Sequence, residues 1–363
     1  MGNKLRIGII GTGGIAGAHA AAYKTFNDIE IVAGADIIPG KAREFLDRFG
    51  WTDATAYDTH EELCKRDDID AVSVCVYNSQ HAVCAIAALE SGKHVLLEKP
   101  MCVTLDEAVQ IMKAEKKSGK IITIGFQPRY NENCKKIKKI VESGELGKIY
   151  YVQIGGSRRR GIPGSTFIDK EKAVFGAIGD LGCYSLDLSL NSIGYPKPLT
   201  VSSYTSDYFG KNPKYYDEAH RFGVDDFSAA FIRLEGDIIL DYRMAWAMHM
   251  DICSDFVILG TDAGLKATAP KPNPLWGSII GGDIAGLYIM HDQCGEPVST
   301  ELALAHTYGD PFTMKVRDFV DAVKNNGTAP IPTSQIIYNQ AIIDAMLISA
   351  REKCEVKIEI PTI

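Results

Sequence analysis

The sequence predicts an α/β protein in two parts: an N-terminal doubly wound parallel sheet, and a C-terminal α+β domain with a large, open, mostly antiparallel sheet. The first observation is length, because 363 residues exceed what one hydrophobic core usually organises. The second is the alternation of apolar strands and helices up to residue 126. The third is the run of strand-like segments beyond it, with few helices between them. We therefore expect domains at 1–126 and 127–363.

The elements of the first domain follow from short apolar runs, which predict strands, and longer runs, which predict helices. Gly92 closes one helix as a C-terminal cap, and Thr104 opens another as an N-terminal cap. We expect strands at 5–10, 29–35, 71–76, 94–98 and 121–126, and helices at 16–25, 41–49, 81–91 and 105–117.

The second domain is expected to present one sheet face to helices and the other to a partner. Residues 269–295 are rich in loop-forming residues, so we expect an insertion or a lid there. The remaining segments predict helices at 133–142, 312–324 and 335–353, and strands at 149–155, 200–204, 227–234, 238–245 and 255–260.

Composition excludes several classes of protein. Hydrophobic residues make up 46% and charged residues 23%, and no apolar run reaches the roughly 18 residues that span a bilayer. The first residues lack a secretion signal, so we expect a cytoplasmic protein with no membrane partner. A net charge of −7 without an extended basic block argues against a nucleic-acid partner. Nine cysteines without a C-x-x-C pair predict reduced thiols and no metal site.

A glycine-rich turn, G-T-G-G-I-A (11–16), lies between the first strand and the first helix, as a dinucleotide-binding fingerprint requires. Gly11 permits the tight turn, and Gly13 lets the backbone approach a pyrophosphate. Ala16 allows the helix to pack closely on the sheet, and the helix N-terminus attracts phosphate. A tight turn without a ligand is the alternative.

Asp36 ends the second strand about 25 residues after the glycine-rich turn begins, where an acidic residue binds the adenosine ribose. A carboxylate there repels a 2′-phosphate. Because Ile37 and Ile38 follow and no arginine occurs before Arg43, we predict NAD rather than NADP. The alternative is a solvated aspartate at a strand end.

The segment V-L-L-E-K-P (95–100) is an apolar strand that ends in a carboxylate, an ammonium group and a proline. Together with G-T-G-G-I-A-G-A-H (11–19), Y-N-S-Q-H (77–81) and G-D-L-G-C-Y-S-L-D (179–187), it resembles the Gfo/Idh/MocA oxidoreductases over nearly the whole chain. The resemblance implies a Rossmann domain and these cofactor-binding residues: Gly11, Thr12, Gly13, Gly14, Ile15, Asp36, Ile37, Asn78, His81, Glu98, Lys99 and Gln127.

The resemblance also implies the catalytic residues Lys99, Asp180 and Tyr184. A cis peptide before Pro100 is expected to aim Lys99 at the nicotinamide ribose and the substrate hydroxyl. Family members typically carry histidine where this chain has Tyr184, so either Tyr184 or Lys99 could be the base. A phenol can also transfer a proton. Considered without the other motifs, Glu98 and Lys99 could be a surface ion pair that ends a strand. Asp180 could likewise be a carboxylate that caps a helix.

Four further residues fit a polyol site: Arg159, Arg160, Trp246 and His249. The arginines and the histidine could bind hydroxyl groups, and the tryptophan could stack on a sugar ring. As alternatives, the arginines could be a solvated strand edge, Trp246 could be core, and His249 could be a buried structural histidine.

By resemblance we expect NAD-dependent oxidation of a secondary hydroxyl, at C3, of a sugar or glycoside, C-glycosides included. A downstream lyase could then act on the 3-oxo product. The rivals are an inositol, cyclitol or aldose dehydrogenase, a redox-neutral NAD-dependent glycosidase or lyase, and a non-catalytic sugar sensor. An isologous contact between open sheets predicts a homo-oligomer, a dimer or a higher even order. The sequence leaves open the aglycone, the oxidised carbon and whether NAD exchanges.

Overall fold

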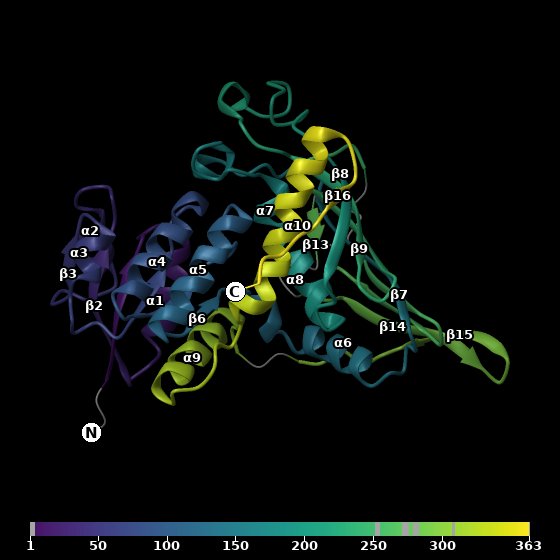
Figure 1. Ribbon diagram of the computed structural model, residues 1–363, viewed down its shortest axis with the longest axis horizontal. Coiled ribbons are helices and arrows are strands. Elements are labelled where there is room, and N and C mark those ends of the chain that lie inside the picture. Colours follow the sequence, from purple (N-terminus) through teal and green to yellow (C-terminus); the bar gives the residue numbers. More distant parts are fainter. Residues whose placement is uncertain (1–3, 251–254, 271–275, 279–282, 307–308, 363) are drawn as a thin grey trace. The chain divides into compact units, whose positions relative to one another are not determined.

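A computed structural model describes residues 4–250, 255–270, 276–278, 283–306 and 309–362. The chain forms two compact units. The first, here called the parallel-sheet unit, comprises Met1–Phe126, Gly309–Ile337 and Pro361–Ile363. The second, here called the mixed-sheet unit, comprises Gln127–Tyr308 and Tyr338–Ile360. Figure 1 labels their elements.

The parallel-sheet unit contains six parallel strands in the order β3-β2-β1-β4-β5-β6. This is the strand order of a doubly wound dinucleotide-binding fold. Its central strand β4 is buried along its whole length, as expected for a parallel sheet with helices on both faces. The strands are β1 (Leu5–Ile10), β2 (Ile29–Ala35), β3 (Thr55–Tyr57), β4 (Ala71–Val74), β5 (His94–Leu97) and β6 (Ile122–Ile124).

Helices of the parallel-sheet unit follow the strands in sequence. Thr104 caps α5 as predicted, in a reciprocal capping box with Glu107. The helices are α1 (Gly14–Tyr23), α2 (Lys41–Arg48), α3 (His60–Cys64), α4 (His81–Glu90), α5 (Leu105–Ser118) and α9 (Pro311–Lys324).

Helix α9 joins the parallel-sheet unit although it lies far along the chain. Val316, Phe319 and Val320 are buried in the same hydrophobic cluster as residues of β1, β2 and α1. The second domain was predicted to extend from 127 to 363, but residues 309–337 belong to the parallel-sheet unit. Sequence order placed the segment in the second domain, but its apolar face is buried in the first core.

The mixed-sheet unit has a large sheet in the order β15-β14-β12-β11-β7-β10-β9-β8-β16, with β13 paired to β7. All its described pairings are antiparallel except that of β7 with β10, which agrees with the predicted fold class. The strands are β7 (Ile149–Arg158), β8 (Pro198–Ser206), β9 (Phe227–Leu234), β10 (Ile238–Ala245), β11 (Phe256–Gly260), β12 (Gly264–Thr268), β13 (Trp276–Ser278), β14 (Gly286–Gln293), β15 (Glu296–Glu301) and β16 (Val356–Lys357).

Strand β14 corrects the expectation of a loop-rich insertion or lid over 269–295. It pairs with β12 on one side and β15 on the other, so the second half of this segment belongs to the sheet. Residues 271–275 and 279–282 lie outside the described part of the chain. The helices of the unit are α6 (Glu132–Glu142), α7 (Ala177–Asp180), α8 (Gly182–Ser192) and α10 (Thr333–Glu352), the last belonging to it from residue 338.

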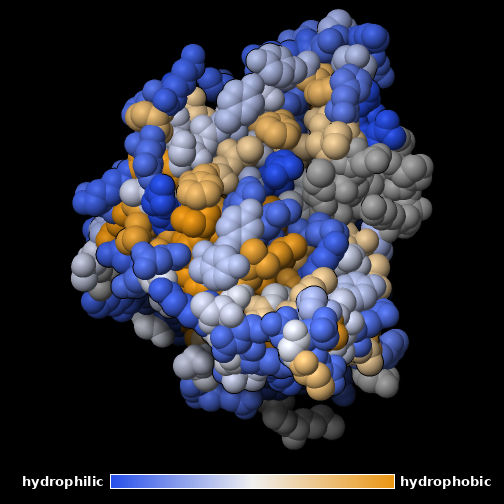
Figure 2. All heavy atoms as spheres, turned by 90° about the vertical axis from the view of Figure 1, so that its right-hand side faces the viewer, coloured by the Kyte–Doolittle hydropathy of each residue, from blue (hydrophilic) through white to orange (hydrophobic). Residues whose placement is uncertain are grey.

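The two faces of the mixed sheet differ in burial. The inner face is apolar and buried, with Val152, Ile232 and Leu240 on neighbouring strands and α8 entirely buried. On the outer face, Phe231 is 44% and Met290 39% exposed. Figure 2 shows hydrophobic residues gathered among hydrophilic ones on the side of the molecule where β7, β9 and β14 lie. In the described ranges, no helix has the length and apolar character to cross a bilayer.

Candidate functional site

The glycine-rich turn after β1 has the geometry that a dinucleotide needs. Gly11 has a φ of +82°, and a β-carbon there would lie 2.5 Å from the carbonyl oxygen of Cys75. Gly13 and Gly14 face open space, because an added β-carbon would meet no atom within 4 Å. Helix α1 begins at Gly14, so its first N–H groups lie beside this open backbone. These features fit a bound pyrophosphate.

Asp36, at the end of β2, is held as a carboxylate beside that turn. It accepts hydrogen bonds from the backbone N–H (2.9 Å) and hydroxyl (2.7 Å) of Thr12 and from the N–H of Ile38 (3.0 Å). Burial alone would raise the pKa of Asp36, but these hydrogen bonds and the Lys41 ammonium group, 3.2 Å away, lower it. An ionised Asp36 can accept hydrogen bonds from ribose hydroxyl groups. Ile37, which follows it, is 66% exposed.

Lys99 follows β5 on a turn built over a buried ion cluster. The Lys99–Pro100 peptide bond is cis, as the resemblance predicted. Glu98 lies beneath and accepts hydrogen bonds from His19 Nε2 (2.7 Å) and Lys315 Nζ (2.5 Å) through Oε1, and from the Lys99 N–H (3.3 Å) through Oε2. Sequence reasoning missed Lys315, because it lies 217 residues from Glu98 on α9.

The charges in this cluster follow from burial and pairing. Burial would raise the pKa of Glu98, but Lys315 and His19 hold it well below its usual range. Burial lowers the pKa of His19, and Lys315 lowers it further. Glu98 is therefore ionised and His19 is neutral. The buried Glu98 carboxylate supports the turn by accepting a hydrogen bond from the Lys99 N–H.

The predicted cofactor residues of this unit gather at one edge of the sheet. Gly11–Ile15 follow β1, Asp36 and Ile37 follow β2, Asn78 and His81 follow β4, and Glu98 and Lys99 follow β5. Parallel neighbouring strands bring their carboxyl ends to the same edge, and the order reverses between β1 and β4. His81 supports this edge, since its ring nitrogens face the carbonyl oxygens of Pro100 (2.5 Å) and Val76 (3.0 Å).

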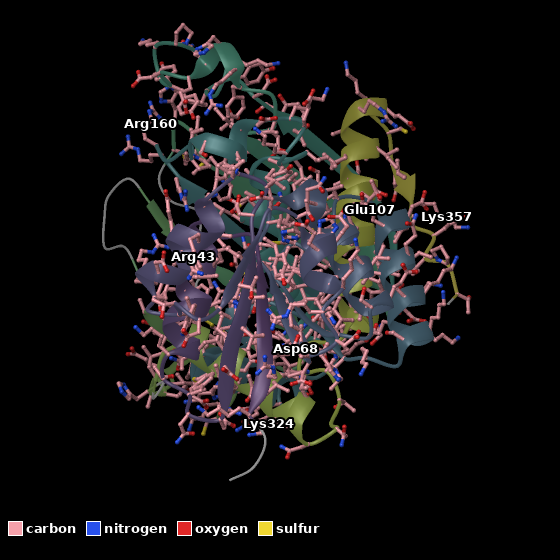
Figure 3. The ribbon with its side chains drawn as sticks, turned by 90° about the vertical axis from the view of Figure 1, so that its left-hand side faces the viewer. Arg43, Asp68, Glu107, Arg160, Lys324 and Lys357 are labelled. Carbon is pink, nitrogen blue, oxygen red and sulfur yellow. The ribbon has the colours of Figure 1, made fainter. Side chains whose placement is uncertain are left out.

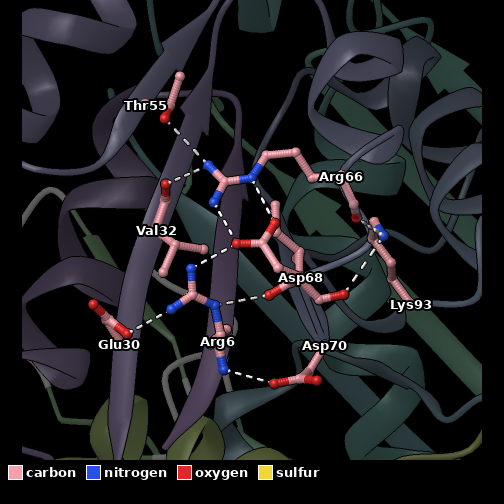
Figure 4. Close-up of polar contacts among 9 residues, drawn as sticks. Arg6, Glu30, Val32, Thr55, Arg66, Asp68, Asp70 and Lys93 are labelled. Atoms are coloured by element: carbon pink, nitrogen blue, oxygen red, sulfur yellow. Dashed lines mark hydrogen bonds and ion pairs between the residues drawn. The ribbon is translucent and has the colours of Figure 1, made fainter.

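The opposite edge of the sheet carries a structural network of charged residues. Asp68, labelled in Figure 3 and drawn close up in Figure 4, binds the guanidinium groups of Arg6 (2.6 Å) and Arg66 (2.7 Å). Arg6 also pairs with Glu30, and Arg66 donates to the carbonyl oxygen of Val32. These bonds join β1 and β2 to the turn before β4. They lie at the amino ends of the strands, opposite the carboxyl ends that carry the predicted cofactor residues.

In the mixed-sheet unit, a buried carboxylate holds the segment that carries Asp180. Asp225 accepts hydrogen bonds from the N–H groups of Gly176 (2.7 Å) and Ile178 (2.8 Å). A β-carbon at Gly176 would lie 1.8 Å from the carbonyl oxygen of Asp225, so only glycine fits there. Burial raises the pKa of Asp225 to about 6. Sequence reasoning missed Asp225, although an Asp-Asp pair opening a strand is a visible signal.

Tyr184 and Asp180 have different partners. The Tyr184 hydroxyl lies 3.0 Å from Gln127 Nε2 and 3.2 Å from Gln127 Oε1. Gln127 thus contacts a predicted catalytic residue and belongs to the mixed-sheet unit, unlike the other predicted cofactor residues. Asp180 lies near Arg158: burial lowers the pKa of Arg158, and the Asp180 carboxylate partly offsets that effect. Arg158 was not among the predicted site residues.

Two of the predicted substrate residues meet in a cationic and aromatic cluster. Arg160 Nη2 lies 3.3 Å from His249 Nδ1, and its guanidinium lies over the rings of Phe209 (5.1 Å) and Tyr215 (4.9 Å). Arg160 is labelled in Figure 3. The loop after β8 supplies both aromatic residues, and no pattern in the sequence indicated them. Arg159 is exposed beside this cluster.

The burial of Trp246 does not fit the predicted role of stacking on a sugar ring. It is 0% exposed, so its indole ring offers no face to a sugar. Its backbone N–H donates to the carbonyl oxygen of Asp226 (2.8 Å), just beyond the end of β10. We therefore assign Trp246 to the core, which was the alternative interpretation of the sequence.

Comparison with known proteins agrees with this organisation. Residues 5–126 match the model of an oxidoreductase family with an NAD-binding Rossmann fold, and residues 134–266 match the GFO/IDH/MocA C-terminal domain. Among the described residues, no group of three or more His, Cys, Asp or Glu side chains is placed to hold a metal ion.

Three relatives have assigned activities. D-glucoside 3-dehydrogenase of Escherichia coli K12 is 30% identical over 265 residues, covering 69% of this chain and 75% of that protein. Inositol 2-dehydrogenase of Salmonella typhimurium is 36% identical over 146 residues, 40% of this chain and 43% of the relative. Glucose-6-phosphate 3-dehydrogenase of Bacillus subtilis is 34% identical over 189 residues, 50% and 52% of the two chains. The last two matches thus span about half of each relative or less.

Solved structures share the fold over the whole chain. Levoglucosan dehydrogenase, in complex with NADH and levoglucosan, superposes with a TM-score of 0.81 at 22% identity, covering 98% of this chain and all of that one. An oxidoreductase domain protein from Kribbella flavida gives the same TM-score and identity, with 99% and 100% coverage. The predicted family is confirmed: this chain belongs to the Gfo/Idh/MocA oxidoreductases and uses NAD.

Proposed function

We propose that the protein is an NAD-dependent dehydrogenase that oxidises a secondary hydroxyl group, at C3, of a sugar or glycoside. The observation that carries the proposal is Lys99, which extends from the same sheet edge as the glycine-rich turn and Asp36. This position supports a role for the Lys99 ammonium group beside the bound cofactor. The names of the Escherichia coli and Bacillus subtilis relatives support C3 as the oxidised carbon.

NAD⁺ supplies the hydride acceptor. The N–H groups at the start of α1 would hold its pyrophosphate, and Asp36 would hold its adenosine ribose. In the oxidation, the carbon loses a hydride and the hydroxyl oxygen loses a proton, giving a ketone. We assign this proton to Tyr184 and Lys99, and we assign Asp180 to orienting the substrate hydroxyl.

Substrate recognition is assigned to the mixed-sheet unit. Arg158, Arg159, Arg160 and His249 provide donors for hydroxyl groups, and the rings of Phe209 and Tyr215 pack against Arg160 and His249. A 3-oxo product has an acidified hydrogen at C2. A separate lyase could therefore expel the C1 substituent, including a carbon-linked aglycone.

The outer sheet face is proposed to pair with a second copy of the chain. Phe231 and Met290 are hydrophobic side chains exposed on this face of the single chain. An isologous contact with the same face of a second copy would bury both of them. The expected product is a dimer or a higher even oligomer.

The direct test mixes the full-length protein and NAD⁺ with glucose, myo-inositol, xylose, and O- and C-glucosides, following absorbance at 340 nm and product mass. We expect a two-dalton loss from a glycoside, abolished in Lys99→Ala and retained in Lys113→Ala, a control at an exposed lysine of α5. Oxidation of inositol alone would favour the cyclitol dehydrogenase. Aglycone release without net NADH would favour the redox-neutral enzyme, and intact substrates with tight NAD binding would favour the sensor.

A further inference from the structure

The side-chain amide of Gln127 faces the phenol oxygen of Tyr184 with both of its polar atoms. Nε2 lies 3.0 Å and Oε1 3.2 Å from the Tyr184 hydroxyl oxygen. Gln127 opens the 3-10 turn η2 (Gln127–Tyr130), and Tyr184 lies in the first turn of α8. Both belong to the mixed-sheet unit, so the contact lies within one compact body.

A buried ion pair fixes η2 against α8. Arg129, two residues after Gln127, donates from Nε (2.9 Å) and Nη2 (2.6 Å) to the carboxylate of Asp187, three residues after Tyr184. The Tyr195 hydroxyl donates to the same carboxylate (2.8 Å). Burial alone would lower the pKa of Arg129, but Asp187 holds it above its usual value. Arg129 therefore stays charged, and its two hydrogen bonds to Asp187 set the position of the Gln127 amide relative to the phenol.

An amide can bond to a phenol in both of its protonation states. Its N–H donates to a phenolate oxygen, and its carbonyl oxygen accepts from a phenol hydroxyl. It does so without changing its own charge. A carboxylate in that place could only accept, and its charge would oppose the phenolate.

We infer that Gln127 is a catalytic residue that stabilises the Tyr184 phenolate, rather than a residue whose main contact is the cofactor. This inference rests on the proposed function, in which Tyr184 takes the proton of the substrate hydroxyl. In that step the hydroxyl O–H bond breaks, the phenolate gains the proton, and the hydride leaves carbon for NAD⁺. Gln127 Nε2 donates to the oxygen before the transfer, and Oε1 accepts from the new hydroxyl after it. Arg129 and Asp187 are positioning residues.

The test compares Gln127→Met, which keeps the length of the side chain, with Gln127→Glu and with the exposed control Gln110→Leu on α5. In Gln127→Met we expect the pH at which kcat/KM for oxidation rises to move up by about one unit, because the phenolate loses one charge-assisted hydrogen bond. At pH values below the rise, kcat/KM falls about tenfold. Gln127→Glu should move the profile further in the same direction, and Gln110→Leu should leave it unchanged.

A second readout does not depend on turnover. In protein labelled with ¹³Cζ-tyrosine, the Tyr184 signal among 16 tyrosines is assigned by its loss in Tyr184→Phe. We expect this signal to titrate at higher pH in Gln127→Met than in the wild type. If no substrate is oxidised, the proposed function fails but this titration still decides the role of Gln127. Unmoved kinetic and NMR profiles in both Gln127 variants would overturn the inference.

Discussion

Replacing Lys315 with methionine is expected to destabilise the parallel-sheet unit strongly, because it removes one half of a buried ion pair. The Lys315 side chain is 1% exposed and that of Glu98 4%. Methionine fills similar space but leaves Glu98 with the His19 ring and an amide N–H as partners. Breaking a buried pair in this way costs about 3–5 kcal/mol. Because a domain's stability is about 5–15 kcal/mol, this is a large share.

Hydrogen exchange of the full-length protein, measured by mass spectrometry on peptides from β5 and α9, would report the loss. Every 1.4 kcal/mol of lost stability lowers hydrogen-exchange protection tenfold, so protection should fall by about two to three and a half orders of magnitude. Lys324→Met is the matched control on the same helix. Lys324 pairs with Asp28 at 2.6 Å but is 32% exposed, so its loss should cost at most about 1 kcal/mol.

A double variant, Lys315→Met with Glu98→Gln, separates charge from packing. Removing both charges should restore most of the lost protection, since the desolvated carboxylate is gone. Equal losses of hydrogen-exchange protection in Lys315→Met and Lys324→Met would contradict a special cost of the buried pair. A double variant no more protected than Lys315→Met would show that the unpaired Glu98 carboxylate is not the cause.

The same pair predicts a pH dependence. The pKa of Glu98 is lower in the folded than in the unfolded protein. Its contribution is therefore fully present above the ordinary glutamate pKa of about 4.3 and is lost as pH falls below it. Between neutral pH and pH 3, wild-type protection in β5 should decrease more than that of the double variant. An identical decrease in both would contradict this assignment.

Three further changes test other parts of the account. Gly11→Ala should weaken NADH binding at least tenfold in a fluorescence titration, because the β-carbon meets the Cys75 carbonyl oxygen; unchanged affinity would contradict the assigned turn. Asp225→Asn should lower kcat about tenfold with NADH affinity within twofold, since one amide oxygen cannot replace two carboxylate oxygens; full activity would remove Asp225 from the supporting structure. Wild-type protein should sediment as the proposed oligomer and Phe231→Glu as a monomer in sedimentation velocity, whereas an oligomer unchanged by Phe231→Glu would place the interface elsewhere.

The regular elements could be predicted where one local signal dominates. Strands at Leu5–Ile10, Ile29–Ala35, Phe227–Leu234 and Ile238–Ala245 have the predicted bounds, because apolar runs or alternation end at turn residues. The strand β3 (Thr55–Tyr57) was missed because it has only three residues and is an outermost strand of its sheet. Strand β14 was missed because its second half is exposed and polar.

The candidate site was predictable where a motif encodes backbone geometry. The glycine-rich turn, Asp36 and the turn at Lys99 lie at one sheet edge, as parallel topology requires. Lys315, Asp225 and the Gln127 contact depend on residues distant in sequence, so no local pattern reveals them. Trp246 shows the opposite error, since a large aromatic residue more often fills a core than binds a sugar.

The proposed reaction transfers a hydride from C3 of a glycoside to NAD⁺. The most direct measurement incubates the protein with NAD⁺ and a glucoside deuterated at C3, and separately at C2, and weighs the reduced cofactor by mass spectrometry. We expect reduced cofactor that is heavier by one dalton from the C3-deuterated glucoside only, and we expect this signal to be lost in Lys99→Ala. Deuterium arriving from C2 instead, or reduced cofactor without label from either glucoside, would contradict hydride transfer from C3.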